Sequence, residues 1–209
     1  MARKPSTNKP SRDRNLKPNR PGRTEKGEVR IIGGDWRGRK LPVLVADGLR
    51  PTSDRVRETV FNWLQFEVPG ANCLDVFAGS GALGLEALSR GASHVTLLEL
   101  NGENVKQLKQ NLKTLKVEKA EVIQTDSLQW LAKQSIQPYD VIFLDPPFNQ
   151  GLMQPAVDLI FKNGFLKTDQ AWLYLEQEKQ LDWPELPEGW ACFREKSTSQ
   201  VKYALFKQE

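Results

Sequence analysis

A rigid turn with few hydrogen-bond donors follows an apolar run in the second half of the chain. Residues 141–144 read VIFL, and Asp145, Pro146, Pro147 and Phe148 come directly after them. The two prolines fix two φ angles and remove two N–H donors, which leaves the Asp145 carboxylate and the Pro146 carbonyl as acceptors beside an aromatic ring.

Such a turn suits a planar base that carries an amino group. An aryl amine is a poor nucleophile, and two acceptors that bind its N–H hydrogens favour a pyramidal nitrogen and stabilise the positive charge that develops as it attacks a methyl group. The ring of Phe148 can hold the base by stacking. The turn therefore predicts a methyl-transfer pocket, with a purely structural turn as the alternative.

A glycine-rich loop lies upstream. Residues 75–84 read DVFAGSGALG, so Gly79, Gly81 and Gly84 form the pattern G-x-G-x-x-G between an apolar run and an amphipathic one. Glycine permits a tight turn and a close approach of the backbone to a ligand, and the N–H groups that begin a helix bind polar groups. Glu99 follows Gly79 by 20 residues, where a carboxylate can accept from both ribose hydroxyls. These features predict an adenosine-containing ligand.

Three polar residues narrow the choice of ligand. Asp75 would point a carboxylate at the glycine loop, which disfavours a pyrophosphate and favours the ammonium and sulfonium of S-adenosylmethionine (SAM); an acid that braces the loop is the alternative. Asp126 and Ser127 follow the third apolar run, where an adenine edge would lie. An ordinary helix N-cap explains Asp126 equally well.

Alternation of apolar and amphipathic stretches predicts a doubly wound, Rossmann-like α/β fold. Its sheet has seven mostly parallel strands and ends in an antiparallel C-terminal hairpin. Strands are predicted at 73–77, 94–100, 120–124, 140–144, 172–175, 190–194 and 201–206, and helices at 82–89, 102–115, 127–134 and 153–162. In such a sheet the glycine loop and Asp145 lie at the same carboxyl edge.

The upstream part divides into a tail and a small subdomain. Residues 1–30 contain ten Lys or Arg, three acids and four prolines, so we expect residues 1–28 to form a disordered basic tail that contacts nucleic acid. A tail that only adds solubility and an Arg-rich transit peptide are the alternatives. Residues 29–66 are predicted to form a small β-hairpin within 29–41 and a helix after Ser53, together a lid over cofactor and substrate. On that helix Val56, Val60 and Trp63 share one face, and Arg57 lies largely elsewhere. The main domain is residues 67–209.

Composition excludes several classes of function. No window reaches the roughly 18 apolar residues of a membrane span, and no hydrophobic signal segment opens the chain, so we expect a cytoplasmic protein. Cys73 and Cys192 are far apart and His94 is the single histidine, which predicts neither a metal site nor histidine-based catalysis.

Two flanking segments extend the pattern to a known family. The D-V-F-A-G-S-G loop, Glu99, Asp126 and the D-P-P-F turn together resemble class I SAM-dependent methyltransferases that act on exocyclic amino nitrogens. Residues 30–41 (RIIGGDWRGRKL) and 50–63 (RPTSDRVRETVFNW) are similar to signature segments of the RsmD family of bacterial 16S ribosomal RNA guanine-N2 methyltransferases. The resemblance runs from about residue 29 to the end of the chain.

The resemblance implies an activity and a set of site residues. It implies methyl transfer from SAM to the 2-amino group of a guanine in 16S rRNA of the assembling small ribosomal subunit, by a monomer and without a metal. Residues of the D-P-P-F turn would act in catalysis, namely Asp145, Pro146 and Phe148. The implied cofactor-binding residues are Asp75, Phe77, Gly79, Ser80, Gly81, Glu99, Leu100, Asp126, Ser127 and Thr52. The implied substrate-binding residues are Arg37, Arg39, Lys40, Arg57 and Pro147.

Three rival readings remain open. Another amino methyltransferase, such as one that acts on adenine N6 in DNA, could use the same turn. An NAD-binding oxidoreductase could use the glycine loop, although it gives Asp75 and the D-P-P-F turn no role. An RNA-binding protein that has lost its activity is the third, and the intact Asp145 disfavours it.

Overall fold

The computed structural model of the chain describes residues 25–45, 53–133, 135 and 137–209. The predicted cofactor residue Thr52 and the first 24 residues of the predicted basic tail lie outside these ranges. Within them, no helix combines the length and the apolar character needed to cross a bilayer.

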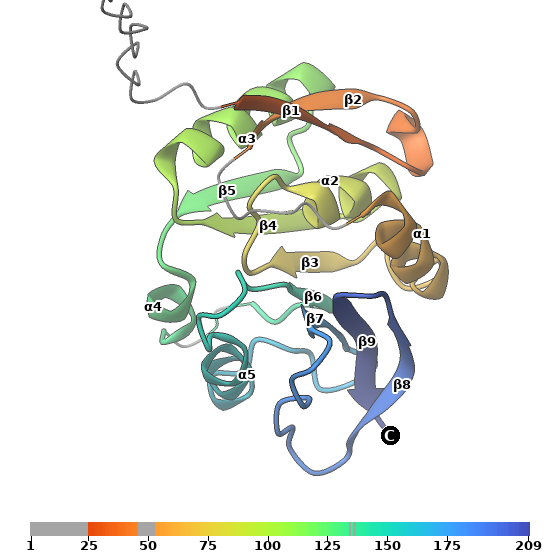
Figure 1. Cartoon of the computed structure of the whole chain (residues 1–209), viewed down its shortest axis with the longest axis vertical. Helices are drawn as coiled ribbons and strands as arrows, with labels where there is room; N and C mark the ends of the chain where they lie inside the picture. Colours follow the sequence, from red (N-terminus) through yellow and green to blue (C-terminus); the bar gives the residue numbers. More distant parts are fainter. Residues whose placement is uncertain (1–24, 46–52, 134, 136) are drawn as a thin grey trace, which may run out of the picture.

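A seven-stranded sheet forms the centre of the molecule (Figure 1). Neighbouring strands follow the order β5-β4-β3-β6-β7-β9-β8, in which the first five are parallel and the last two pair antiparallel. The predicted fold class is confirmed. The strands are β3 (Asn72–Asp75), β4 (His94–Glu99), β5 (Ala120–Gln124), β6 (Val141–Leu144), β7 (Trp172–Glu178), β8 (Trp190–Ser197) and β9 (Val201–Gln208).

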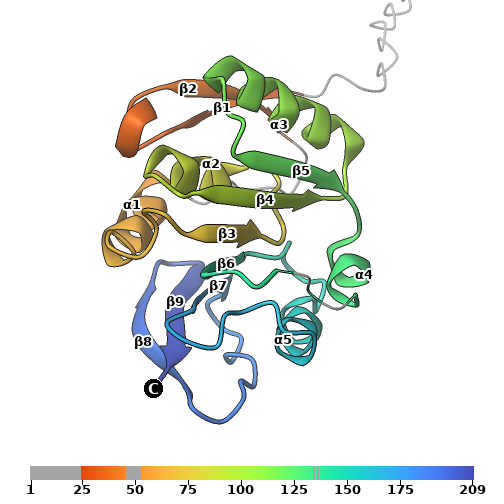
Figure 2. The ribbon, with the colours of Figure 1, turned by 180° about the vertical axis from the view of Figure 1, so that it is seen from behind.

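Helices cover both faces of the sheet, as Figures 1 and 2 show from opposite sides. Because side chains alternate along a strand, Phe143 packs on one face with α1, α2 and α3, whereas Ile142 and Leu144 pack on the other face with α4 and α5. Burial on both faces explains the continuous apolar run of β6. The helices are α1 (Asp54–Trp63), α2 (Ala82–Ser89), α3 (Gly102–Leu115), α4 (Ser127–Leu131) and α5 (Met153–Lys162).

Local capping explains where the helices begin. The Ser53 hydroxyl accepts the Val56 N–H at 3.3 Å before α1, and the Asn101 side chain accepts two N–H groups of the first turn of α3. Gly81 precedes α2 in the left-handed region, at φ 77°. The bounds predicted for α2, α3 and α5 agree with the structure.

The N-terminal hairpin differs from the prediction at both ends. Its strands are β1 (Glu25–Arg30) and β2 (Lys40–Val45), with a short 3-10 helix η1 (Gly34–Trp36) between them. The predicted boundary of the tail at residue 28 is therefore wrong, because residues 25–28 pair with residues 42–45. At its other end the hairpin, predicted within 29–41, continues to Val45. Between the strands, the backbone after Ile31 turns to bond α2.

Three further elements end at other residues than predicted. The helix predicted to reach residue 134 ends as α4 at Leu131, whose carbonyl accepts the Asn163 side-chain N–H at 2.8 Å. The strand predicted to end at residue 175 continues as β7 through the buried polar residues Glu176 and Gln177, because β9 pairs with it as far as Glu178. The strand predicted over 73–77 is shorter, since β3 ends at Asp75.

Candidate active site

Parallel strands bring two aspartates to the carboxyl edge of the sheet. Asp75, the last residue of β3, is in register with Phe143 of β6, and Asp145 follows Phe143 by two residues. Side chains two apart along an extended chain share a face, so Asp145 lies on the same side as Asp75, one step further along the neighbouring strand. The prediction that Asp145 lies at the carboxyl edge that carries the glycine loop is confirmed.

The glycine loop requires two of its glycines for steric reasons. Gly81 has a positive φ, and a Cβ built there would lie 2.4 Å from Leu108 Cδ2. At Gly84 a Cβ would lie 2.8 Å from Leu97 Cδ2 and 3.2 Å from Asp75 Oδ2. The start of α2 therefore packs directly against α3 and against the strands β3 and β4, and the half-buried Ser80 lies just before it.

Glu99 joins the glycine loop to the end of β4. Its Oε2 accepts the Gly79 N–H at 2.8 Å, and its Oε1 accepts the Asn101 N–H at 2.6 Å. Each carboxylate oxygen has a second lone pair, so both can still accept from ribose hydroxyls. The next side chain, Leu100, is 67% exposed and offers an apolar surface beside the carboxylate. Phe77 is half-buried on the other side of the loop.

Asp75 is buried and braces α2. Its Oδ2 accepts the Gly84 N–H at 3.0 Å, and the residue is 2% exposed. Burial raises the pKa of Asp75 to about 7; the Gly84 hydrogen bond opposes this shift, and the charges of Asp145 and Glu99 add to it. The bracing role is thus present. Because this pKa lies close to neutral pH, the Asp75 carboxyl group can lose its proton when a cationic ligand binds beside it.

Asp126 and Ser127 have structural roles at the start of α4. Asp126 Oδ1 accepts the Gln129 N–H at 2.9 Å, which confirms the N-cap interpretation. The Ser127 hydroxyl donates to the Val76 carbonyl at 2.5 Å and ties α4 to the end of β3. Contact of either residue with an adenine stays a prediction.

The D-P-P-F turn leaves the sheet beside these groups. Asp145 and Pro147 are half-buried, Pro146 is buried, and the Phe148 ring is 39% exposed. The Asn149 N–H donates to Glu178 Oε1 at 2.7 Å and ties the turn to β7. The turn therefore presents an aromatic ring to solvent from a backbone that is held on both sides.

Sequence reasoning missed a buried acid in this region. The Tyr174 hydroxyl donates to Glu176 Oε2 at 2.6 Å, and both residues are buried on β7. Burial is the main cause that raises the pKa of Glu176 well above its usual value, and the charge of Asp145 adds to it. In the sequence, the one feature that could have indicated this buried acid is its position directly after the apolar residues 172–175. Asp75, Asp145 and Glu176 make this edge of the sheet acidic.

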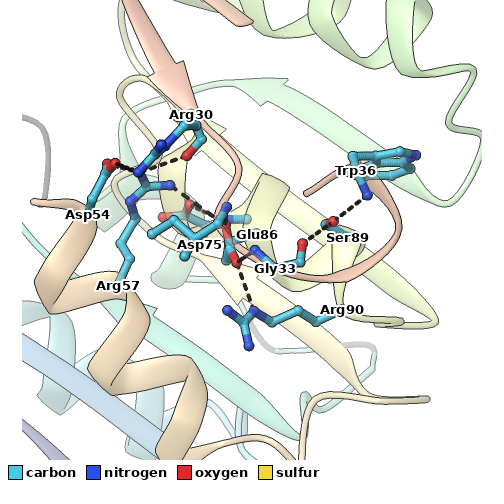
Figure 3. Close-up of polar contacts among 11 residues, drawn as sticks. Arg30, Gly33, Trp36, Asp54, Arg57, Asp75, Glu86, Ser89 and Arg90 are labelled. Atoms are coloured by element: carbon cyan, nitrogen blue, oxygen red, sulfur yellow. Dashed lines mark hydrogen bonds and ion pairs between the residues drawn. The ribbon is translucent and has the colours of Figure 1, made fainter. Parts of the chain in front are cut away.

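Arg57 does not reach the surface, which corrects its predicted role in substrate binding. Its side chain is 1% exposed, donates to the Arg30 carbonyl at 2.9 Å and to Asp54 Oδ1 at 2.6 Å, and lies 3.8 Å from Glu86 Oε2 (Figure 3). A buried guanidinium requires charged partners, and the fully buried Glu86 supplies one. Arg57 therefore holds α1 to α2 and β1.

Glu86 also fixes the loop between the strands of the N-terminal hairpin. Its carboxylate accepts the N–H groups of Ile32 and Gly33 at 2.8 Å each and the Arg90 Nε–H at 2.7 Å. The Ser89 hydroxyl donates to the Gly33 carbonyl at 2.6 Å (Figure 3). The loop is thus bound to the second half of α2, whereas the glycine loop precedes its first residue.

Three predicted substrate-binding residues lie on or next to that loop. Arg37, Arg39 and Lys40 are exposed, as a role in RNA binding requires. The neighbouring Trp36 N–H donates to the Ser89 hydroxyl at the last residue of α2, about 10 Å along the helix axis from its first residue. The structure therefore groups these three cations together but does not bring them to the D-P-P-F turn.

Comparisons with known proteins agree with this geometry. The family model described as "Conserved hypothetical protein 95" matches residues 29–207. The chain is 49% identical over 190 residues, 91% of its length and 95% of the relative, to the Ribosomal RNA small subunit methyltransferase D of Escherichia coli K12. It is 54% identical over 186 residues, 87% of its length and 95% of the relative, to the protein of that name from Haemophilus influenzae. The solved structure of a candidate methyltransferase, yhhF, from Escherichia coli superposes with a TM-score of 0.80 at 46% identity and covers 88% of this chain and 99% of its own.

Proposed function

The chain belongs to the family of the ribosomal RNA small subunit methyltransferases D, and from this premise we propose that it methylates the N2 amino group of a guanine in 16S rRNA. The methyl donor is SAM. The observation that carries the proposal is the position of Asp145: it directly follows β6, the strand that pairs with the strand of Asp75, at the edge where the glycine loop meets Glu99.

The residues at the sheet edge fit SAM. The Gly79–Gly81 loop with Asp75 would hold the methionine part, Glu99 the ribose, and Leu100, Asp126 and Ser127 the adenine. The carboxylates of Asp145 and Glu99, together with Asp75 when it is ionised, favour a cationic ligand over a pyrophosphate at this edge, which argues against an NAD-binding oxidoreductase. SAM supplies an electrophilic methyl group on a sulfonium.

The D-P-P-F turn then acts on the guanine. The Asp145 carboxylate and the Pro146 carbonyl accept the two N–H hydrogens of the amino group and draw its lone pair out of conjugation with the ring. Phe148 stacks on the base, and Pro147 closes the turn without adding a donor. As an acceptor of one of these hydrogens, the Asp145 carboxylate would also take the proton that the nitrogen loses after the methyl transfer.

Substitution of Asp145 tests this assignment. In Asp145→Ala one of two acceptors is lost, so we expect kcat for methyl transfer to 16S rRNA to fall by about 100-fold or more. Affinity for S-adenosylhomocysteine, measured by calorimetry, should stay within about threefold of the wild type, because other residues bind the cofactor. Asp169→Ala, which removes an exposed carboxylate before β7, is the matched control and should retain full activity. Full turnover by Asp145→Ala would refute the proposed mechanism.

A further inference from the structure

The C-terminal hairpin carries rings and cations in contact with one another on one face. Arg194 Cζ lies 5.2 Å from the centre of the Phe193 ring, and Lys196 Nζ lies 5.9 Å from that of Trp63. Lys207 Nζ lies 4.6 Å from the centre of Phe193 and 5.5 Å from that of Trp172. We call this set of six residues the hairpin face: Trp63, Trp172, Phe193, Arg194, Lys196 and Lys207.

Strand register places the cations and the acid of β8 on opposite sides of the hairpin. Lys196 pairs with Tyr203, which stacks on Trp63 of α1, so Lys196 and α1 lie on the same side. The intervening Glu195 points the other way, where its Oε2 accepts the Trp183 Nε1–H at 3.2 Å. The acid of β8 is therefore kept off the hairpin face, which carries three positive charges.

These cations are available to a partner. Arg194 and Lys196 are exposed, Lys207 is half-buried, and none of the three forms an ion pair with any residue that the structure describes. Phe193 is 44% exposed, so a partner can reach its ring. Figures 1 and 2 show β8 at the free edge of the sheet, with α1 beside the hairpin.

One end of the hairpin face lies level with Asp145 across the neighbouring strands of the sheet. Leu144 pairs with Leu175, so Asp145 lies level with Glu176, which pairs with Tyr203, which in turn pairs with Lys196. Three strand spacings separate Asp145 from Lys196, about 14 Å. From there the cations continue along β8 and β9, through Arg194 to Lys207.

We propose that the hairpin face is a docking surface for the RNA that carries the target guanine. Phosphates would bind Arg194, Lys196 and Lys207, and an unpaired base would stack on Phe193. Charge complementarity supports this occupant, because cations placed over rings suit a polyanion that also exposes flat bases. The inference rests on the proposed function, since it takes the substrate to be RNA.

The same features have a second explanation. β8 is an edge strand with a bulge between Cys192 and Arg194, and edge strands that carry Lys and a bulge resist pairing with another chain. On that view the cations prevent self-association and do not contact RNA. The two explanations predict different results for the same variant.

A charge-neutralising variant separates them. We expect R194Q/K196Q/K207Q to bind an unmodified 16S rRNA transcript at least about tenfold more weakly at 0.15 M salt and to lower the slope of log K against log salt by about 2 to 3. KM for the transcript should rise accordingly, with kcat and S-adenosylhomocysteine affinity unchanged. The control K133Q/K162Q/K202Q removes the same charge from the opposite face, where Lys202 also lies over a ring, Trp183, at 4.4 Å. It should stay within about threefold of the wild type.

Each other outcome has a defined meaning. Unchanged RNA binding together with dimers or aggregates of R194Q/K196Q/K207Q in light scattering would overturn the docking surface in favour of edge protection. Equal losses in both triple variants would overturn it in favour of total charge alone. If the wild type itself transfers no methyl group to the transcript or to small subunits that lack the modification, the proposed function fails first, and the comparison of binding slopes still decides whether this face contacts RNA.

Discussion

At the scale of single residues, the site contains two acids, Asp75 and Glu176, whose pKa is raised by burial. Asp75 is predictable from its place before the glycine loop, but its burial and its bond to Gly84 are not, because they depend on how closely α2 packs against β3. Glu176 was missed for the same reason: a glutamate after an apolar run normally marks the end of a strand, and only its bond with Tyr174 and the pairing of β7 with β9 explain its burial.

The raised pKa of Asp75 predicts pH-dependent cofactor binding. With a pKa of about 7, Asp75 is largely neutral at pH 6 and ionised at pH 8, and only the ionised form attracts the ammonium of the ligand. Calorimetry with S-adenosylhomocysteine should show Kd falling by up to about tenfold from pH 6 to pH 8. Asp75→Asn should bind more weakly at pH 8 and lose this dependence.

The same shift has a consequence for stability. The unfolded carboxyl group loses its proton near its ordinary value of 3.8, whereas the folded one keeps it until about pH 7. The folded state therefore binds more protons over this range, so the contribution of Asp75 to stability decreases as pH rises from about 4 to about 7 and is constant above it.

A Kd for S-adenosylhomocysteine that does not change with pH in the wild type would contradict the role given to Asp75 in binding the cofactor.

At the scale of elements, helices were easier to predict than the N-terminal segment. α2 and α3 follow from a glycine before the first and the Asn101 cap before the second, which are local signals. The loop after Ile31 follows from Glu86, more than 50 residues away, and no local pattern reveals such a partner. Arg57 is similar: helical periodicity places it off the apolar face, yet a buried carboxylate draws it inside.

Glu86 is expected to be the anchor of the N-terminal segment. Glu86→Gln keeps the shape of the side chain but leaves the partly buried Arg90 without its anion and the buried Arg57 with only the half-exposed Asp54, so we expect the free energy of unfolding to fall by about 3 kcal/mol or more. The matched control Glu103→Gln removes an exposed partner of Lys106 and should cost less than about 1 kcal/mol. Urea denaturation compares the two. Equal stabilities would show that Glu86 does not anchor the loop.

At the scale of the whole molecule, the acidic residues of the site lie at the carboxyl ends of the parallel strands, and two groups of cations lie elsewhere on the surface. Excluding residues 1–30, the chain has 20 Lys or Arg and 23 Asp or Glu, so the body has a net charge of −3. The acids at the carboxyl edge suit a cationic methyl donor, whereas Arg37, Arg39 and Lys40 at one loop and the hairpin face at the sheet edge suit an RNA backbone. The topology was predictable from alternation along the sequence; which cations lie together was not, because it depends on strand register.

The identity of the methylated nucleoside distinguishes guanine-N2 methylation from methylation at any other nitrogen. Unmodified 16S rRNA, free and in small subunits, is incubated with the purified protein and isotopically labelled SAM, then digested to nucleosides and analysed by mass spectrometry. We expect label in N2-methylguanosine, formed at least about 100-fold more slowly by Asp145→Ala. Label in N6-methyladenosine, or in a guanosine methylated at a ring nitrogen, would contradict it.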